Sequence, residues 1–548
     1  MAERARIVLM LFLLLASACG RRQEPAAAIP ELDPAQDVPA IGDAIVHGSI
    51  GDGSTLIPML SSDSASHEYA GYIFDGLLTY DKTLSTLEPR LAERWEVSED
   101  GLQITFFLRK DVKWTDGAPF TARDVEFGFH TIRDPATLTS YAEDYMQVKT
   151  FELLDDHSFR VTYDKPFAPA LASWGSMVVL PRHLLEGQNI NETDFGQRPV
   201  GLGSHMFASW ERNTRFTLRA NPDYYRGRAF IEQVAFRVIP DQSTQFLELK
   251  SGGIDMMGLA PLQYSRQTST PFFEKAFRKY RYVSNSYTYL GYNLSNPMFS
   301  DVRVRRAFTH AIDKQEIVDV VLFGLGQPAD TPYRPGTLWL NQNVAKYDFD
   351  PARARELLAE AGWKDNDGDG ILDKDGKPFA FKIITNQGND QRLKTATIVQ
   401  RRLREIGVDV GVRVLEWSSF INDFVDKRRF EVVMLGWSLS LDPDQYDIWH
   451  SSKTAVKQFN FVGYDNPQVD ELLDRGRRTF DEAERKRVYD QVQDHLAADQ
   501  PYTFLYVPDS LPIVSSRFRG IEEAPGGIEW NFIQWYVPRP LQKYAVTP

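Results

Sequence analysis

A strand–helix–strand–strand pattern between residues 379 and 436 constrains the fold of this chain more than any other feature. Residues 379–384 predict a first strand, and valines at every second position over 408–414 predict a second. The apolar run 430–435 predicts a third strand, buried on both faces. Between the first two strands, apolar residues recur at helical spacing: Ala396, Val399, Leu403 and Ile406. This order predicts an α/β fold with an open sheet, and such sheets bind ligands in the crevice beyond their strand ends.

The chain has 548 residues, which is too long for one hydrophobic core and predicts two or three domains. A hairpin is predicted where Asp100 and Gly101 separate the apolar runs 95–97 and 102–108. Helices are predicted to begin where a capping side chain precedes an apolar helical stripe. Such starts occur at Thr121, Asp301, Asp350 and Asn466, and a further long helix is predicted over 481–499.

The N-terminus has the composition of an export signal. Arg4 and Arg6 precede the apolar run 7–16. This run is too short to span a bilayer, because a spanning helix needs about 20 apolar residues. It has the length expected of the apolar centre of a signal peptide.

Cys19 is the only cysteine of the chain, so neither an internal disulfide nor a cysteine-based metal site can form. It comes after the small residues 16–18, and this arrangement resembles the bacterial lipoprotein signal. We therefore expect removal of residues 1–18, lipidation of Cys19 and a flexible tether over 19–44. The protein would then work in the cell envelope, anchored to the periplasmic or extracytoplasmic face of a membrane. A plain secretory signal, cut just before Cys19 or beyond it, is the alternative.

The overall charge and the missing motifs exclude several function classes. The formal net charge is −13, which argues against nucleic acid as the main partner because phosphate binding needs a basic surface. The sequence signatures of serine hydrolases, zinc proteases and nucleotide-binding loops are absent. The nine histidines are scattered, which disfavours a local histidine metal site. We therefore expect a binding protein that is not an enzyme and requires no cofactor.

One acidic loop has the spacing of a calcium-binding loop. Carboxylates at its positions 1, 3, 5 and 9 and a backbone carbonyl at position 7 suit calcium. These ligands would come from Asp365, Asp367, Asp369, Asp373 and Ile371. Gly376 stands where a bidentate Glu would complete the site, so any affinity should be weak. Structural calcium and a bare turn-rich loop are the two interpretations.

Five stretches together resemble the bacterial extracellular solute-binding proteins of family 5, which are the peptide-, oligopeptide- and nickel-binding components of ABC importers. They occur in the family's order and cover nearly the whole chain after the tether. The stretches are FDGLLTYDKTLSTLEPRLAERWEVSEDGLQITFFLRKDVKWTDGAPFTARDVEF at 74–127, NPDYYRG at 221–227, LKSGGIDMM at 249–257, NPMFSDVRVRRAFTHAIDKQEIV at 296–318 and FDPARARELLAEAGW at 349–363.

The resemblance implies a two-lobed periplasmic-binding-protein fold of type II, which closes about a hinge, with an additional third domain. Lobe I would comprise 45–72, 209–288 and 509–548, the extra domain 73–208, and lobe II 289–508. It also implies a monomer whose partners are a small solute or peptide and the transmembrane subunits of an ABC permease.

The resemblance also indicates ligand-binding residues. Trp417 and Trp437 stand at predicted strand ends, at positions that resemble pocket residues of peptide-binding relatives. Gly436 and Ser438 flank the second tryptophan and would line the same pocket. The alternative is that both tryptophans pack into the core of the lobe.

The charged contacts of peptide-binding relatives are altered here. Ser440 stands where these relatives place an Asp that pairs with the peptide ammonium, and Asp442 or Asp444 would have to take that role. Met434 stands where some relatives carry a basic residue for the peptide carboxylate. Recognition of free peptides by the family's usual ion pairs is therefore not expected.

We expect a lipid-anchored substrate-binding protein that captures a peptide or peptide-like solute and delivers it to an ABC permease. A non-peptide polar solute, such as an opine, a sugar or a metal chelate, is the alternative. A sensory or chaperone module is a second alternative, which the sequence does not separate from the first. An envelope hydrolase would need a nucleophile and a base, and no motif offers them.

Overall fold

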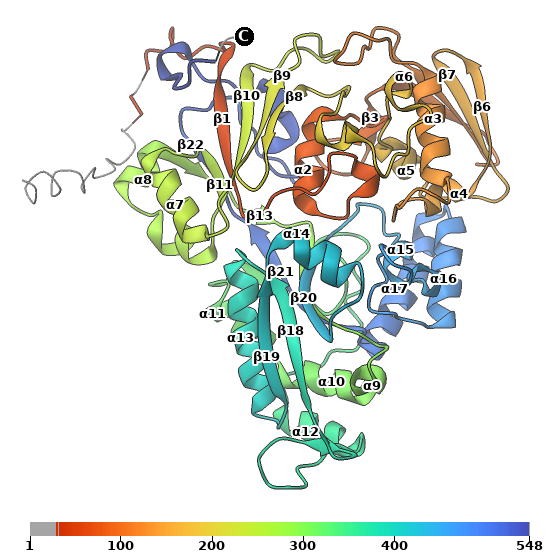
Figure 1. The fold of residues 1–548 in the computed structure, drawn as a ribbon, viewed down its shortest axis with the longest axis vertical. Helices are drawn as coiled ribbons and strands as arrows, with labels where there is room; N and C mark the ends of the chain where they lie inside the picture. Colours follow the sequence, from red (N-terminus) through yellow and green to blue (C-terminus); the bar gives the residue numbers. More distant parts are fainter. Residues whose placement is uncertain (1–28, 31, 547–548) are drawn as a thin grey trace, which may run out of the picture.

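The computed structural model describes residues 29–30 and 32–546, so the predicted export signal and Cys19 lie outside the described part of the chain. Two seven-stranded sheets lie one above the other in Figure 1, and a four-stranded sheet lies beside the upper one. We call the upper seven-stranded sheet and the four-stranded sheet together the upper lobe. The lower seven-stranded sheet and its helices form the lower lobe.

The upper seven-stranded sheet is mixed, because β1 runs parallel to β10 and β11 whereas its other pairings are antiparallel. Both of its faces are buried: Ile45 and Phe236 belong to one core cluster, and Val46 and Ala235 to another. Its strands, in spatial order, are β12 (Phe277–Lys279), β22 (Pro512–Ser515), β11 (Met256–Gly258), β1 (Gly42–Ser49), β10 (Ile231–Val238), β9 (Arg215–Ala220) and β8 (His205–Glu211). Helices α7 (Gln242–Ser251) and α8 (Pro271–Ala276) contribute to the second cluster.

The four-stranded sheet contains the predicted hairpin. Its order is β4 (Ala92–Val97), β5 (Gln103–Leu108), β7 (Ser158–Tyr163) and β6 (Val148–Asp155). Helix α3 (Ala122–Arg133) begins at the predicted cap, where the backbone N–H of Thr121 donates to Asp124 at 2.9 Å. One hydrophobic cluster runs from this sheet into the upper seven-stranded sheet and also includes helix α2 (Ser64–Ile73). The upper lobe is therefore a single packed body.

The lower sheet confirms the pattern on which the sequence analysis began. The chain forms β18 (Ala380–Asn386), helix α13 (Asp390–Arg404), β19 (Asp409–Leu415) and β20 (Val432–Ser438), with β18 parallel to both other strands. Alternate residues of β20 face two core clusters, Val432 and Met434 on one side and Val433 and Leu435 on the other. The sheet continues with β14 (Ser286–Tyr292), β21 (Tyr502–Ser510), β13 (Tyr282–Val283) and β15 (Gly326–Pro328).

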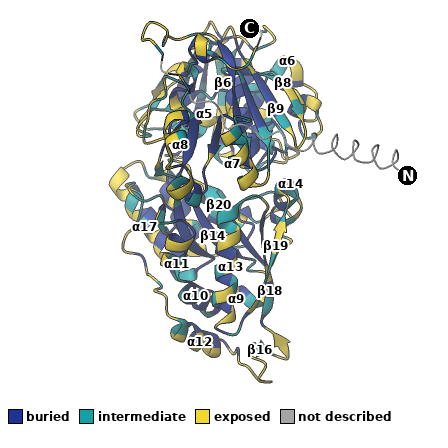
Figure 2. Cartoon of the chain, turned by 90° about the vertical axis from the view of Figure 1, so that its left-hand side faces the viewer, coloured by how far each residue is buried: buried dark blue, intermediate teal, exposed yellow. Residues whose placement is uncertain are grey.

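Helices cover both faces of the lower sheet, and three begin at predicted caps. Asp301, Asp350 and Asn466 each accept a backbone N–H from the helix after them. One face packs against α10 (Val302–Ala311), α12 (Pro351–Glu360) and α13, and the other against α16 (Pro467–Arg478) and α17 (Glu482–Asp499). In the turned view of Figure 2, the buried strands lie inside each lobe and exposed helices lie around them.

The chain crosses between the lobes at two neighbouring points. Residues 280–281 lead from β12 in the upper sheet to β13 in the lower one, and Leu511 leads from β21 back to β22. Strands β13 and β21 pair with each other, and an ion pair of 2.6 Å joins Arg281 to Asp509. The predicted boundaries after 288 and 508 fall inside β14 and β21. They are displaced from the crossings because these strands extend the lower sheet up to the point where the chain changes lobe.

The described residues just before β1 contact the folded body. Leu32 packs against the core of the upper lobe, Asp37 pairs with Arg519 at 3.1 Å, and β1 already begins at Gly42. The prediction of a flexible segment over 19–44 is therefore wrong for its described C-terminal part, because apolar and charged side chains there find partners on the folded body. None of the described helices has the length and apolar character needed to cross a membrane.

Candidate functional site

A cavity of about 850 Å³ lies between the two lobes. Strands β18, β19 and β20 are parallel, so they end at the same edge of the lower sheet, and this edge faces the cavity. The upper lobe contributes the opposite wall. The lining residues come from the segments 62–80, 141–176, 286–288, 389–392, 417–461 and 506–508.

All six residues predicted to bind a ligand line this cavity: Trp417, Gly436, Trp437, Ser438, Ser440 and Asp442. Both tryptophans are half-buried, and each combines packing with exposure to the cavity. The ring of Trp437 stacks on Phe461 at 5.7 Å between centroids, and its Nε1 donates to the Tyr502 hydroxyl at 3.3 Å. Trp417 lies against the upper lobe, where a Cβ on Gly51 would come within 3.0 Å of its ring.

The charged groups predicted as ammonium partners are already paired. Arg485 donates to both carboxylate oxygens of Asp442, at 2.7 and 2.8 Å. Asp444 accepts from Arg477 at 2.8 Å. The hydroxyl of Ser440 accepts from the backbone N–H of Asp442 at 3.3 Å. Two of the three groups therefore line the cavity with their charges compensated, and the third carries no charge.

Three other acidic side chains line the cavity and accept no hydrogen bond from the described residues: Glu68, Asp426 and Asp447. Burial raises the pKa of Asp426 from its ordinary value of 3.8 to about 6. Glu68 is open to the cavity, yet burial by the surrounding protein, helped by Glu529, raises its pKa to about 8. Burial and the nearby Asp144 raise the pKa of Asp447, and the nearest ammonium, that of Lys453, lies 3.8 Å away. A cationic group of a ligand would find uncompensated acceptors here.

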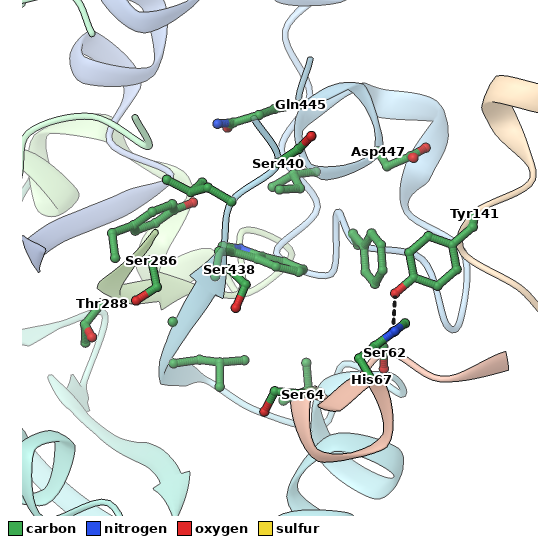
Figure 3. A pocket seen from close by; sticks show the side chains of 18 of the residues that line it. Ser62, Ser64, His67, Tyr141, Ser286, Thr288, Ser438, Ser440, Gln445 and Asp447 are labelled. Carbon is green, nitrogen blue, oxygen red and sulfur yellow. Dashed lines mark hydrogen bonds between the residues drawn. The ribbon is translucent and has the colours of Figure 1, made fainter. Parts of the chain in front are cut away.

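Hydroxyl groups surround both ends of the cavity. Figure 3 shows Ser286 and Thr288 across the cavity from Tyr141 and Asp447. The hydroxyl of Tyr141 lies within hydrogen-bond distance of His67 Nε2, at 3.1 Å, and this contact joins two segments of the upper lobe. Polar donors and acceptors therefore lie on opposite sides of the cavity, where they could contact a polar solute.

Arg392 is the lining residue that carries an uncompensated positive charge. It lies in the first turn of α13, just beyond the end of β18, and its Nη1 donates to Asn386 at 2.9 Å. No described carboxylate lies within ion-pair distance of it, whereas the other buried cations beside the cavity have such partners. Burial lowers the pKa of its guanidinium, which nevertheless keeps its proton because its ordinary pKa is so high.

Beside the cavity, buried ion pairs join the lobes. Arg477 of the lower lobe pairs with Asp144 of the upper lobe, and Lys453 of the lower lobe pairs with Glu143 at 2.5 Å. The backbone N–H of Ala168 donates to the carbonyl of Arg477 at 2.7 Å. These contacts hold the two walls together.

The predicted calcium loop is far from this cavity in the fold, at the end of α12. Ligand oxygens of Asp365, Asp367 and Asp369 lie within 4.8 Å of one another, and all three residues are exposed. The carboxylate of Asp373 instead accepts from Asn366, at 2.6 Å from its side chain and 3.0 Å from its backbone. Three of the predicted carboxylates therefore converge, and structural calcium stays a prediction.

Comparison with known proteins identifies the class. The family model for bacterial extracellular solute-binding proteins, family 5 (middle), matches residues 86–459. This chain belongs to that family. Its two lobes are those of a periplasmic-binding-protein fold, and it is a solute-binding protein of the ABC-importer type rather than an enzyme. The family is extracellular by description.

Relatives of this family-5 protein have been solved with different ligands. The oligopeptide-binding protein AppA of Bacillus subtilis is 32% identical over 546 residues, 97% of this chain and 98% of AppA. The AppA structure in complex with a nonapeptide matches with a TM-score of 0.87 over 91% of this chain and 100% of that one. NikZ of Campylobacter jejuni, in complex with Ni(L-His), is 30% identical, with a TM-score of 0.82 over 90% of this chain and 99% of NikZ. DppA of Helicobacter pylori, in complex with the peptide STSA, is 28% identical, with a TM-score of 0.82 over 91% and 99% of the two chains.

Sequence reasoning missed Arg392 and the three acidic residues. Arg392 could have been found, because it lies at the start of the predicted helix that follows the strand 379–384, and ligands of open sheets bind beyond such strand ends. The acidic residues carry no comparable signal. Glu68 comes from the upper lobe, Asp426 from the turn after residues 420–425 and Asp447 from the short helix α15 (Tyr446–Trp449), so only the folded chain brings them together.

Proposed function

We propose that this family-5 protein captures a peptide or peptide-like solute in the cavity between its lobes and delivers it to the permease of an ABC importer. The observation that carries the proposal is the cavity itself. Its volume of about 850 Å³ lies toward the upper end of the range for ligand pockets, and its wall combines two half-buried tryptophans with the unpaired guanidinium of Arg392 and with carboxyl groups that accept no hydrogen bond from the described residues. A zwitterionic chain with apolar side chains fits this combination.

Capture would work by closure of the lobes about the two crossings at 280–281 and 511. Two short neighbouring connections allow one lobe to rotate against the other while each core stays intact. The solute would favour the closed state because it touches both walls only there, and a ligand shifts such an equilibrium only through its differential affinity. The permease would then recognise the closed surface.

We also propose how the protein is anchored to the membrane and which segments form lobe I. Lipidation of Cys19 would hold the protein at the outer face of a membrane in the cell envelope, where a monomer meets the solute before the permease. Lobe I would comprise 45–72, the segment from 209 to the first crossing and the C-terminal segment after the second crossing. The extra domain, 73–208, would lie between the first two of these. Calcium at 365–373 would be structural, since this loop lies away from the cavity.

A non-peptide polar solute is the second candidate, favoured by the charge pattern around Ser440. That position carries no charge, and the carboxylate of Asp442 is occupied by Arg485. An opine, a sugar or a metal chelate would not need the family's ammonium contact. Among the described residues that line the cavity, His67 is the one histidine, so a metal chelate would find a single imidazole there.

Native mass spectrometry of the soluble form, starting after Cys19 and purified without added ligand, tests the proposal. We expect a heterogeneous set of peptide masses that is released on denaturation. A single discrete adduct that is not a peptide would instead support the second candidate. A bare protein mass, combined with no change in melting temperature on addition of a peptide library, would contradict peptide capture.

A further inference from the structure

The uncompensated charge of Arg392 points to a specific contact with the solute. Its Nε is fully enclosed and has no hydrogen-bond partner among the described residues, and its Nη2 donates to none of them. The guanidinium's one partner among these residues is the side-chain oxygen of Asn386, a neutral amide. A cation that is withdrawn from water without a counter-charge raises the free energy of the ligand-free protein. A negative group of a ligand at this point of the cavity would lower it.

The surrounding backbone positions the guanidinium at the cavity wall. Helix α13 begins beyond the end of β18, so Arg392 in its first turn reaches back over the strand ends. Gly436 near the end of β20 leaves room for it: a Cβ there would lie 2.8 Å from Arg392 Nη2 and 2.7 Å from the Tyr287 carbonyl. Any larger residue at 436 would displace the side chain or the neighbouring strand. The close approach therefore depends on glycine at this position.

The same end of the cavity favours a negative group. The first turn of α13 lines it through Asn389 and Gln391, and helix N-termini attract anions. The hydroxyl-bearing residues Ser286 and Thr288 line the wall nearby, from β14. Asp447, which accepts no hydrogen bond from the described residues and has Lys453 as its nearest ammonium at 3.8 Å, lies across the cavity from Thr288 (Figure 3). The cavity is therefore polarised, with its positive end at Arg392.

We propose that Arg392 binds a carboxylate of the solute. This deepens the proposed function and rests on it, since it names the group by which a peptide would be oriented. A guanidinium donates to carboxylates in short, charge-assisted hydrogen bonds, and Nη2 is the nitrogen free to do so. Arg392 would thereby supply the cationic contact that Met434 does not, because Met434 is buried in the core and does not line the cavity.

The test compares matched peptides that differ in one charge. The probe is a mixed-sequence nonapeptide library without acidic residues, prepared with a free C-terminal carboxylate or with a C-terminal amide. Isothermal titration with the soluble form should show at least about tenfold tighter binding of the free acids, the range of a charge-assisted hydrogen bond. Arg392→Gln should remove this preference, and Arg392→Lys should keep part of it.

The control variant is Arg355→Gln on the exposed surface of α12, whose guanidinium donates to the Glu405 carbonyl. It should leave the preference unchanged. Thermal melts of all variants show whether each one folds. A third library, amidated but with one Glu per peptide, distinguishes the source of the carboxylate. Restored affinity that Arg392→Gln abolishes assigns the contact to an acidic side chain and supports the proposal equally.

Failure of this proposal is distinguishable from failure of peptide capture. If the wild type binds acid and amide libraries equally, or if Arg392→Gln keeps the preference, the carboxylate contact is overturned while peptide capture stands. If no library binds, peptide capture fails. Melting-temperature shifts with succinate, citrate and glutamate against glutamine then test Arg392 alone. A shift by the carboxylates that is lost in Arg392→Gln supports the contact, and the absence of any difference overturns it.

Discussion

Two arginines of the lower lobe, buried Arg477 and half-buried Arg392, differ in how their charge is compensated. Arg477 is 5% exposed and is surrounded by Asp144 of the upper lobe and Asp444 of its own lobe, and its guanidinium lies 4.0 Å from the ring centroid of Tyr446. Among the described residues, Arg392 has only the neutral side-chain amide of Asn386 as a hydrogen-bond partner. Both are held by helices beside the cavity, and Arg477 is the less exposed of the two. They also differ in the charges around them.

This difference separates two uses of a buried charge. A cation that is paired within the protein stabilises the contact between the lobes, and removing it leaves carboxylates uncompensated. A cation left unpaired at a cavity wall stabilises little in the free protein and becomes favourable when a ligand brings the missing charge. The acidic residues divide in the same way: Asp442 and Asp444 are paired with arginines, whereas Glu68, Asp426 and Asp447 accept no hydrogen bond from the described residues.

The largest expected effect comes from breaking the paired site. Arg477→Met should lower the free energy of unfolding by about 3–5 kcal/mol, because it strands the buried carboxylates of Asp144 and Asp444. Urea denaturation measures it. The exposed neighbour Arg478, paired with Asp474 at 3.5 Å, is the matched control, and Arg478→Met should cost less than about 1 kcal/mol. Equal losses in the two variants would contradict the distinction.

A carboxylate placed beside Arg392 should pair its guanidinium within the protein, as the guanidinium of Arg477 already is. Asn386→Asp keeps the side-chain shape and puts a charge 2.9 Å from Nη1. We expect the melting temperature of the ligand-free protein to rise, and the affinity for free-acid peptides to fall about tenfold, since the guanidinium is then already paired. Asn343→Asp, on an exposed loop, controls for the added charge. Undiminished affinity in Asn386→Asp would count against a carboxylate contact.

The carboxyl group of Asp426, which accepts no hydrogen bond from the described residues, predicts that peptide affinity depends on pH. This effect should be smaller than the two above. The pKa of Asp426 is raised from 3.8 to about 6, so the group favours the folded state at low pH, and this contribution is lost as the pH rises through 6. A cationic ligand group needs the ionised form. Affinity for C-terminally amidated peptides with a free ammonium should therefore rise somewhat less than tenfold between pH 5 and 7. Titration calorimetry should show a smaller rise of this affinity with pH in Asp426→Asn than in the wild type. If the affinity of the variant rises equally, Asp426 is not the group responsible.

The smallest expected effect concerns the stability of the ligand-free protein without Arg392. Arg392→Met removes one hydrogen bond to Asn386 and also an uncompensated buried charge, and the two changes oppose each other. The free energy of unfolding should change by less than about 1 kcal/mol, as measured in urea. A loss as large as that in Arg477→Met would mean that Arg392 is paired by the protein after all.

The parts of the fold that depend on local pattern could be predicted from the sequence. The unit over 379–436 and the helix caps at Thr121, Asp301 and Asp350 are confirmed, because hydrophobic period and capping are properties of neighbouring residues. The points where the chain changes lobe could not be placed. β14 and β21 belong to the lower sheet through their pairing with each other and with β20, and residues neighbouring in sequence do not show this pairing.

The candidate site was predictable only in part. Trp417 and Trp437 stand at strand ends, and the structure places both on the cavity. The charge state of the site depends on pairs distant in sequence, such as Asp442 with Arg485 and Asp144 with Arg477. No local pattern shows which carboxylates such pairs occupy. For the same reason the sequence did not show that Arg392 has no carboxylate partner among the described residues.

A crystal structure of the soluble form with the tightest-binding nonapeptide, carrying free termini, tests the central claim most directly. The measured quantity is the distance from Arg392 Nη2 to the nearest peptide atom. The account predicts a carboxylate oxygen at about 2.9 Å, within the cavity between the closed lobes. An ordered peptide that presents a neutral or apolar group to Arg392, with its carboxylates elsewhere, would contradict it.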